Sequence, residues 1–186
     1  VAINPEFAMD DFDPDGFIFF AAGRVEVRRG NTENTARLTE DVVVQYVGSD
    51  AGAEWSELTL NARHAVVFLE PGPLDASLER AEVDQIRGIY LEGDVRVRAD
   101  GDRYILRTPR AYYDFTTGQA IAVDAVLRTY TRDVNAPVYA RAREMRQVAA
   151  NQWRAERANV STSEFLVPHF SLGARRVTVT QPPDDA

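Results

Sequence analysis

The amino-acid sequence predicts an all-β protein, elongated and built as a stack of V-shaped rungs. Most of the 186 residues alternate apolar and polar side chains with a period of two, in short runs broken by Gly, Asp, Asn or Pro, a pattern typical of half-buried strands. Comparable strand starts recur at Tyr104, Ile121, Val138 and Trp153, which by subtraction lie 17, 17 and 15 residues apart. Each repeat has room for two short strands and two turns, so each rung would pair with the rungs above and below it.

The individual strands follow from the alternating runs. A Gly-x-Val-x-Val pattern opens two of them, at 23–27 and 93–97. The predicted strands, in chain order, span residues 23–29, 41–46, 57–61, 88–91, 93–98, 103–107, 119–124 and 176–180. In the run 121–129 the alternation predicts one sheltered face and one face that tolerates water. The sheltered face would carry Ile121, Val123, Ala125 and Leu127, and the other face Ala122, Asp124, Val126 and Arg128.

Residues 138–158 give two conflicting signals. Their composition favours a helix, and Val138, Ala142, Met145, Ala149 and Trp153 lie at helical spacings. The register of the neighbouring repeats favours two strands joined by a turn near residues 149–151. We expect the two strands, because a helix here would interrupt the stack. This segment therefore tests the predicted architecture.

The chain is expected to form one domain with two flanking segments. Residues 17–180 carry the alternating runs, and 45% apolar residues are enough for one core. Residues 1–16 differ in pattern from the rest of the chain and are expected to be a flexible lead-in, in part a cloning remnant, which leaves room for a signal peptide that has been removed. Residues 181–186 read as a disordered tail or a cut before another domain. The apolar stretch at 17–22 is far shorter than the ~20 residues of a membrane-spanning helix.

Composition excludes several classes of protein. The chain has no Cys, which excludes a disulfide scaffold and a Cys-based zinc module. Its 29 acidic residues against 21 basic ones give a formal charge of −8, the wrong sign for neutralising nucleic-acid phosphates or docking on anionic lipid headgroups. Partners held by bulk positive charge, nucleic acid among them, are therefore not expected.

The sequence contains no pattern that predicts catalysis or a bound metal or cofactor. Residues 11–16 match the opening of a calcium-binding EF-hand loop, but Ala22 stands at the twelfth position where such loops have a bidentate Glu. His64 and His169 have no zinc-ligand spacing, and no strand-turn-helix elbow surrounds Ser171. We expect no catalytic residues, no metal and no cofactor. Trp55 and Trp153 are most simply core or rim anchors.

The order and spacing of the strands resemble a known family. The Gly-x-Val-x-Val rungs are followed by Thr108–Asp114, by Gly118–Asp124 and by the late stretch Ala158–Val179. Over roughly residues 17–180 the chain resembles the OstA-like periplasmic domains of lipopolysaccharide transport, most of all the N-terminal domain of the outer-membrane assembly protein, which precedes a β-barrel. The outer-membrane members often have Thr-x-Cys where this chain has Ser161-Thr-Ser163, so the disulfides that license their assembly cannot form here.

The resemblance implies a β-jellyroll, or β-taco, that shields lipid acyl chains in an apolar groove without catalysis. The implied ligand is lipopolysaccharide or a similar glycolipid, and the implied location is the periplasm, with attachment to the outer membrane left open. Sister β-jellyrolls would pair at edge strands near 23–27 and 176–180, and the parent chain could continue into an outer-membrane β-barrel. The candidate groove residues are Val25, Val27, Leu58, Leu60, Val95, Val97, Tyr104, Leu106, Tyr113, Ile121, Val123, Ala125, Leu127, Val160 and Phe170.

One alternative from another class stays open at this point. Any β-core has such a set of inward-facing apolar residues, so the same sequence also fits a structural or adhesive β-solenoid with a filled core and no lipid ligand. The two hypotheses differ in whether the interior holds a cavity.

Overall fold

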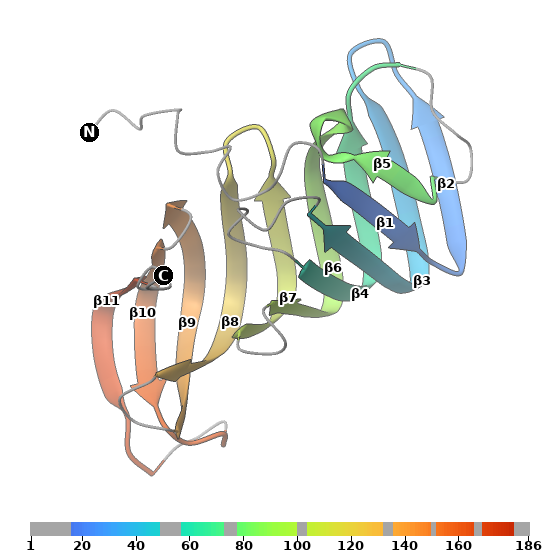
Figure 1. The fold of residues 1–186 in the computed structure, drawn as a ribbon. Helices are drawn as coiled ribbons and strands as arrows, with labels where there is room; N and C mark the ends of the chain where they lie inside the picture. The colour runs from blue at the N-terminus through green and yellow to red at the C-terminus, as the bar shows by residue number, and fades with distance from the viewer. Residues whose placement is uncertain are drawn as a thin grey trace.

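The computed structural model describes residues 16–48, 57–72, 78–99, 104–131, 136–149, 152–165 and 169–180. These residues form one antiparallel sheet with the strand order β11-β10-β9-β8-β7-β6-β4-β3-β1-β5, and β2 pairs with β3 (Figure 1). The strands are β1 (Phe17–Ala21), β2 (Arg24–Arg29), β3 (Asn34–Val47), β4 (Glu57–Leu69), β5 (Arg80–Glu82), β6 (Ile86–Ala99), β7 (Tyr104–Asp114), β8 (Gln119–Thr131), β9 (Ala136–Ala149), β10 (Gln152–Ser161) and β11 (Leu172–Thr180), with one short 3₁₀ helix, η2 (Val83–Gln85). The prediction of an elongated, all-β fold is confirmed.

Residues 138–158 form strands, as the register of the repeats predicts. β9 pairs with β8 on one side and with β10 on the other, and Ala142 and Met145 lie opposite Ala158 and Ala155. Helix-forming composition is overridden here because both edges of β9 are saturated by neighbouring backbone. In the part of the chain that the structure describes, no helix is long and apolar enough to cross a membrane.

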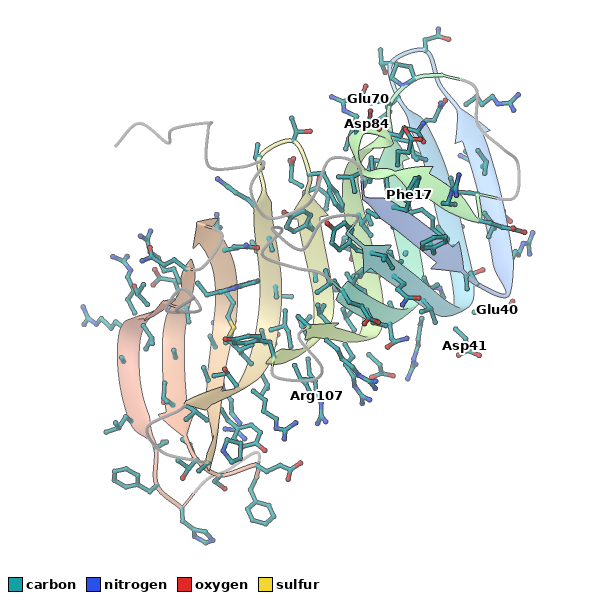
Figure 2. All side chains as sticks on the ribbon, viewed as in Figure 1. Phe17, Glu40, Asp41, Glu70, Asp84 and Arg107 are labelled. Atoms are coloured by element: carbon teal, nitrogen blue, oxygen red, sulfur yellow. The ribbon has the colours of Figure 1, made fainter. Side chains whose placement is uncertain are left out.

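Each long strand bends near its middle, and the bends line up across the sheet. Pairing shifts register between Thr39 and Val42 on β3 and between Glu92 and Val95 on β6. Several residues at the bends have positive φ although they are not glycine; these are Glu40 (67°), Asp41 (53°), Asp94 (50°), Asp124 (47°) and Arg157 (52°). We call this line of bends the crease. In Figure 2, Glu40 and Asp41 project outward where β3 bends.

The crease divides the sheet into two limbs. The first limb contains β2 and the parts of the long strands at 34–39, 64–69, 86–92, 110–114, 119–123, 144–149 and 152–156; the second contains β1 and the parts at 42–47, 57–62, 95–99, 104–108, 125–131, 136–142 and 158–161. β1 and β2 pair with opposite limbs of β3, and the backbone N–H of Gly23 between them donates to the carbonyl of Glu40 at 2.7 Å. V-shaped rungs are therefore made by single bent strands or, for β1 and β2, by two strands joined at the crease.

The crease corrects the predicted faces of the run 121–129. Ala122, Ala125 and Leu127 are buried, whereas Ile121 and Val123 are only half-buried. The residues pointing inward are three apart across the bend at Asp124, so strict alternation fails there. The prediction that Val123 shares the sheltered face with Ala125 and Leu127, and that Ala122 faces water, is wrong for this reason.

The interior is filled unevenly along the stack. Toward β1–β6 the core contains large side chains, among them Ile18, Leu38 and Tyr46, each 1% exposed or less. Toward β8–β10 the buried cluster is smaller, and six of its nine residues are alanine: Ala122, Ala125, Ala140, Ala142, Ala155 and Ala158. Alanine at the crease lets the limbs approach each other but leaves space between them farther out.

Candidate functional site: an apolar cavity between the two limbs

A cavity of about 130 Å³ lies between the two limbs. β6 contributes Ile89 and Leu91 from one side of the crease and Val97 and Ala99 from the other. The neighbouring strands contribute in the same way: β7 gives Tyr104 and Leu106 against Ala111 and Tyr113, and β8 gives Ala120 and Ala122 against Leu127 and Thr129. The cavity is thus formed by the bend itself, since both halves of the same strand face it.

The lining is almost entirely apolar. Its polar side chains are Thr129, Gln147 and the tyrosines, and Gln147 on β9 is buried. The remaining lining residues are Ile18, Val44, Leu58, Leu60, Ile89, Leu91, Val97, Ala99, Leu106, Ala111, Phe115, Ala120, Ile121, Ala122, Leu127 and Trp153. A dry apolar cavity of about 150 Å³ is large enough to bind benzene. This cavity therefore has room for hydrocarbon and few groups that would hold water.

Eight of the fifteen candidate groove residues line this cavity. They come from β4, β6, β7 and β8, and are Leu58, Leu60, Val97, Tyr104, Leu106, Tyr113, Ile121 and Leu127. Their common surroundings place them where a hydrocarbon chain between the limbs would touch them.

The other seven candidates lie outside the cavity lining. Val25 and Val27 on β2 pack against the large core near the start of the sheet, in which Val95 is buried. Ala125 is buried in the alanine-rich cluster and Val160 packs against it. Val123 is half-buried and lies opposite Arg110 and Glu144. Phe170 is 75% exposed. These positions are structural or external in this chain.

Sequence reasoning missed several alanines of the lining, namely Ala111 and Ala122 near the crease and Ala120 farther out on β8. A signal was present in the sequence: alanines three residues apart at mid-strand, as in Ala62 and Ala65, Ala122 and Ala125, and Ala155 and Ala158, mark the inner side of the bend. Trp153 and Gln147 were also missed as lining residues, because β9 and β10 carry mainly alanine and arginine and have weak alternation.

Three aromatic side chains of the lining, Tyr112, Tyr113 and Phe115, make edge-to-face ring contacts. The rings of Tyr113 and Phe115 meet edge to face at 4.7 Å, and those of Phe68 and Tyr112 at 6.2 Å. Tyr112 packs over Gly88, where an added Cβ would meet its hydroxyl oxygen. Burial raises the pKa of Tyr112, and Asp114 raises it further. The hydroxyl therefore stays neutral at physiological pH.

The described residues contain no cluster of three or more His, Asp or Glu side chains that could hold a metal ion. His64, His169 and Ser171 are all exposed. Residues 11–15 of the EF-hand-like segment and Trp55 lie outside the described residues.

Comparisons with known proteins give a likeness in structure. No family model and no curated protein sequence matches the chain. Among solved structures, it resembles LptH of Pseudomonas aeruginosa, described as the LptA-homologous periplasmic component of the conserved lipopolysaccharide transport device. The TM-score is 0.49 at 16% sequence identity, and the likeness covers 94% of this chain and 99% of that chain.

Proposed function

We propose that this domain is a non-catalytic carrier or bridge that shields the acyl chains of a glycolipid such as lipopolysaccharide between its two limbs. The observation that carries the proposal is the cavity, which is apolar, is lined by strands from β1 to β10, and receives both halves of the bent strands β6, β7 and β8. The OstA-like order of strands in the sequence supports the same function, and supports the periplasm as the location.

Such a domain meets a simple physical demand. Exposing one methylene group to water costs ~0.8 kcal/mol, so an acyl chain of about twelve methylenes that crosses water unshielded costs on the order of 10 kcal/mol. A cavity with apolar walls removes this penalty for the methylenes that it covers, and the scarcity of polar lining groups leaves no strong binding position along it. Chains could then slide, with direction imposed by an energy source elsewhere.

The sheet offers strand edges for the proposed partners. Among the residues that the structure describes, β2 pairs only with β3 and β11 only with β10, so each presents one open edge. Sister β-jellyrolls would add there by strand pairing. These edges include the predicted pairing segments at 23–27 and 176–180. A β-barrel farther along the parent chain, and attachment to the outer membrane through it, belong to the same proposal.

Photo-crosslinking tests the proposal. A photo-crosslinking amino acid at Val97 or Leu106, which line the cavity, should capture labelled lipopolysaccharide. The matched control is the same amino acid at Val123, which lies outside the cavity lining, and it should capture little. Equal labelling at the three positions, or no lipid adduct at Val97 and Leu106, would contradict the proposal and favour a β-solenoid with a filled core.

A further inference from the structure

The most exposed large apolar side chains of the described residues are gathered at the connection from β10 to β11. Phe165 is 71% exposed, Phe170 75% and Leu172 66%, whereas Phe19 and Val47 elsewhere reach 41% and 39%. In Figure 2 the side chains around this connection project away from the sheet. Exposed apolar side chains gathered at one place mark an interaction site.

Hydrogen bonds hold the start of this connection against the sheet. The Nη2 of Arg141 on β9 donates to the carbonyl oxygens of Ser163 at 3.0 Å, Glu164 at 2.9 Å and Phe165 at 2.8 Å. The backbone N–H of Ser163 donates to the Ser161 hydroxyl at 2.9 Å. The guanidinium of Arg141 also lies 5.4 Å from the ring centre of Tyr139. The backbone at Phe165 is therefore held in place by hydrogen bonds, while its side chain is exposed.

A second cavity, with both polar and apolar side chains in its lining, lies beside this connection. It has a volume of about 220 Å³ and is lined by Ile105, Arg107, Val126, Arg128, Tyr139 and Glu164. Arg128 lies opposite Ile105 on one neighbouring strand and Tyr139 on the other, so these side chains share one face of the sheet. Arg107 projects away from the ribbon in Figure 2. A guanidinium presents a planar fork of donors that matches phosphate geometry.

Charge is divided unequally along the chain, although the total is −8. Residues 104–180 contain eleven Arg and six acidic residues, a net charge of +5, whereas residues 1–103 contain ten Arg and twenty-one acidic residues, a net charge of −11. The net negative charge of the whole chain disfavours binding to anionic lipid, but the net positive charge of residues 104–180 favours it. Phe165 and Phe170 lie in the basic half.

We propose that Phe165, Phe170 and Leu172, together with Arg107 and Arg128, form a docking patch for the surface of an anionic lipid bilayer. The apolar side chains enter the interface and the guanidiniums bind headgroup phosphates, a combination typical of proteins that lie on a membrane. The inference rests on the proposed function: Trp153 on β10 lines the hydrocarbon cavity, and the patch lies at the other end of that strand. Docking would bring the carrier to the membrane that supplies or receives the lipid.

Vesicle co-flotation tests the patch. The chain should float with vesicles of phosphatidylcholine and phosphatidylglycerol and much less with phosphatidylcholine alone, and added salt should weaken binding. The double variant Phe165→Ser/Phe170→Ser should lower the partition coefficient by about tenfold or more. Arg107→Gln/Arg128→Gln should remove the preference for anionic vesicles. Phe19→Ser, an exposed phenylalanine outside the patch, should leave binding unchanged.

A fluorescent label gives a second readout. Because the chain has no Cys, Ser171→Cys can be labelled alone with an environment-sensitive dye, with the exposed Ala21→Cys as the control position. The dye at 171 should shift to shorter wavelength on anionic vesicles and the dye at 21 should not. Circular dichroism and thermal midpoints equal to wild type would establish that the variants are folded.

Three results would overturn the patch. They are no binding of the wild-type chain to anionic vesicles, undiminished binding of Phe165→Ser/Phe170→Ser, or concentration-dependent self-association that the same double variant abolishes. The test is separable from the proposed function. Photo-crosslinking of detergent-dispersed lipopolysaccharide at Val97 should be unaffected by Phe165→Ser/Phe170→Ser. If no lipopolysaccharide is captured at Val97, the proposed function fails, but the result of the vesicle-binding test still stands.

Discussion

Arg63 on β4 forms an ion pair with Asp94 on β6 at the level of the crease. Both side chains are mostly exposed, at 71% and 76%, so the pair contributes little to stability. Arg110 and Glu92 form a similar exposed pair nearby, with 3.8 Å between nitrogen and oxygen. The bend must therefore be maintained by backbone conformation and by the buried residues on its inner side.

The first prediction concerns the backbone at the crease. Asp124 has φ 47°, a left-handed conformation that costs L-residues about 1–2 kcal/mol and suits β-branched side chains least. Asp124→Val should lower the free energy of unfolding by about 2 kcal/mol, and Asp124→Gly should change it by less than about 0.5 kcal/mol. Urea denaturation measures both. Arg143→Val, exposed on β9, is the control and should be nearly neutral, and a fully stable Asp124→Val variant would show that the crease tolerates any residue.

The second prediction concerns the cavity. Ala111 is half-buried and lines it, so the larger side chain of Ala111→Leu should enter existing space. The variant should be as stable as wild type or up to about 1 kcal/mol more stable, instead of losing the ~1–3 kcal/mol typical of an overpacked core. It should bind a fluorescent fatty acid several-fold more weakly, because the leucine occupies the ligand's space.

The control for the cavity is Ala21→Leu, which makes the same change at an exposed position on β1. It should leave fatty-acid binding unchanged. If Ala111→Leu is strongly destabilised and fatty-acid binding is absent from the wild type, the interior is filled and the carrier hypothesis fails.

The third prediction concerns Asn34, which is 2% exposed and joins two loops. Its Nδ2 donates to the carbonyl oxygens of Glu70 and Gly72, each at 3.1 Å, and its Oδ1 accepts from the N–H of Gly30 at 3.2 Å. Asn34→Ala leaves these groups without that partner and should cost about 2 kcal/mol or more in urea denaturation. Asn159→Ala, at an exposed position on β10, should cost far less. Similar losses in the two variants would contradict a bridging role for Asn34.

The fourth prediction concerns alkaline pH. The pKa of Tyr112 is raised from its ordinary value of 10.0, chiefly by burial. The folded state therefore keeps the proton that the unfolded state loses, so the stabilisation is present below about pH 10 and is lost as pH rises through the folded pKa. Tyr112→Phe should reduce the loss of stability between about pH 9 and about pH 11, measured by urea denaturation. A Tyr112→Phe variant that keeps the wild-type loss would contradict this assignment.

The strands themselves were largely predictable because alternation is a local property. The runs at 57–61 and 119–124, for example, lie inside β4 and β8, although the strands extend farther. Predicted runs at 88–91 and 93–98 proved to be two halves of β6, because Gly93 and Asp94 interrupt the alternation without ending the strand. A sequence run therefore corresponds to a limb more closely than to a whole strand.

The inner face was less predictable because the crease changes the phase of the alternation. Val97 and Leu106 are far enough from the bend that period-two reasoning places them on the cavity side, whereas Val123 lies next to Asp124 and was misplaced. Phe170 was misplaced for another reason, since hydrophobicity alone does not distinguish a buried aromatic from one displayed at the surface. Its position depends on the connection from β10 to β11, and no periodic pattern describes that connection.

The alanines along the crease have a consequence for the width of any ligand that binds in the cavity. Methyl side chains along the bend allow the two limbs to approach closely there, and the cavity is lined by strands from β1 to β10. Unbranched acyl chains should therefore compete with one another for binding in the cavity, whereas rigid fused-ring molecules such as sterols should not bind there. Selectivity would then reside in the smallest side chains of the protein.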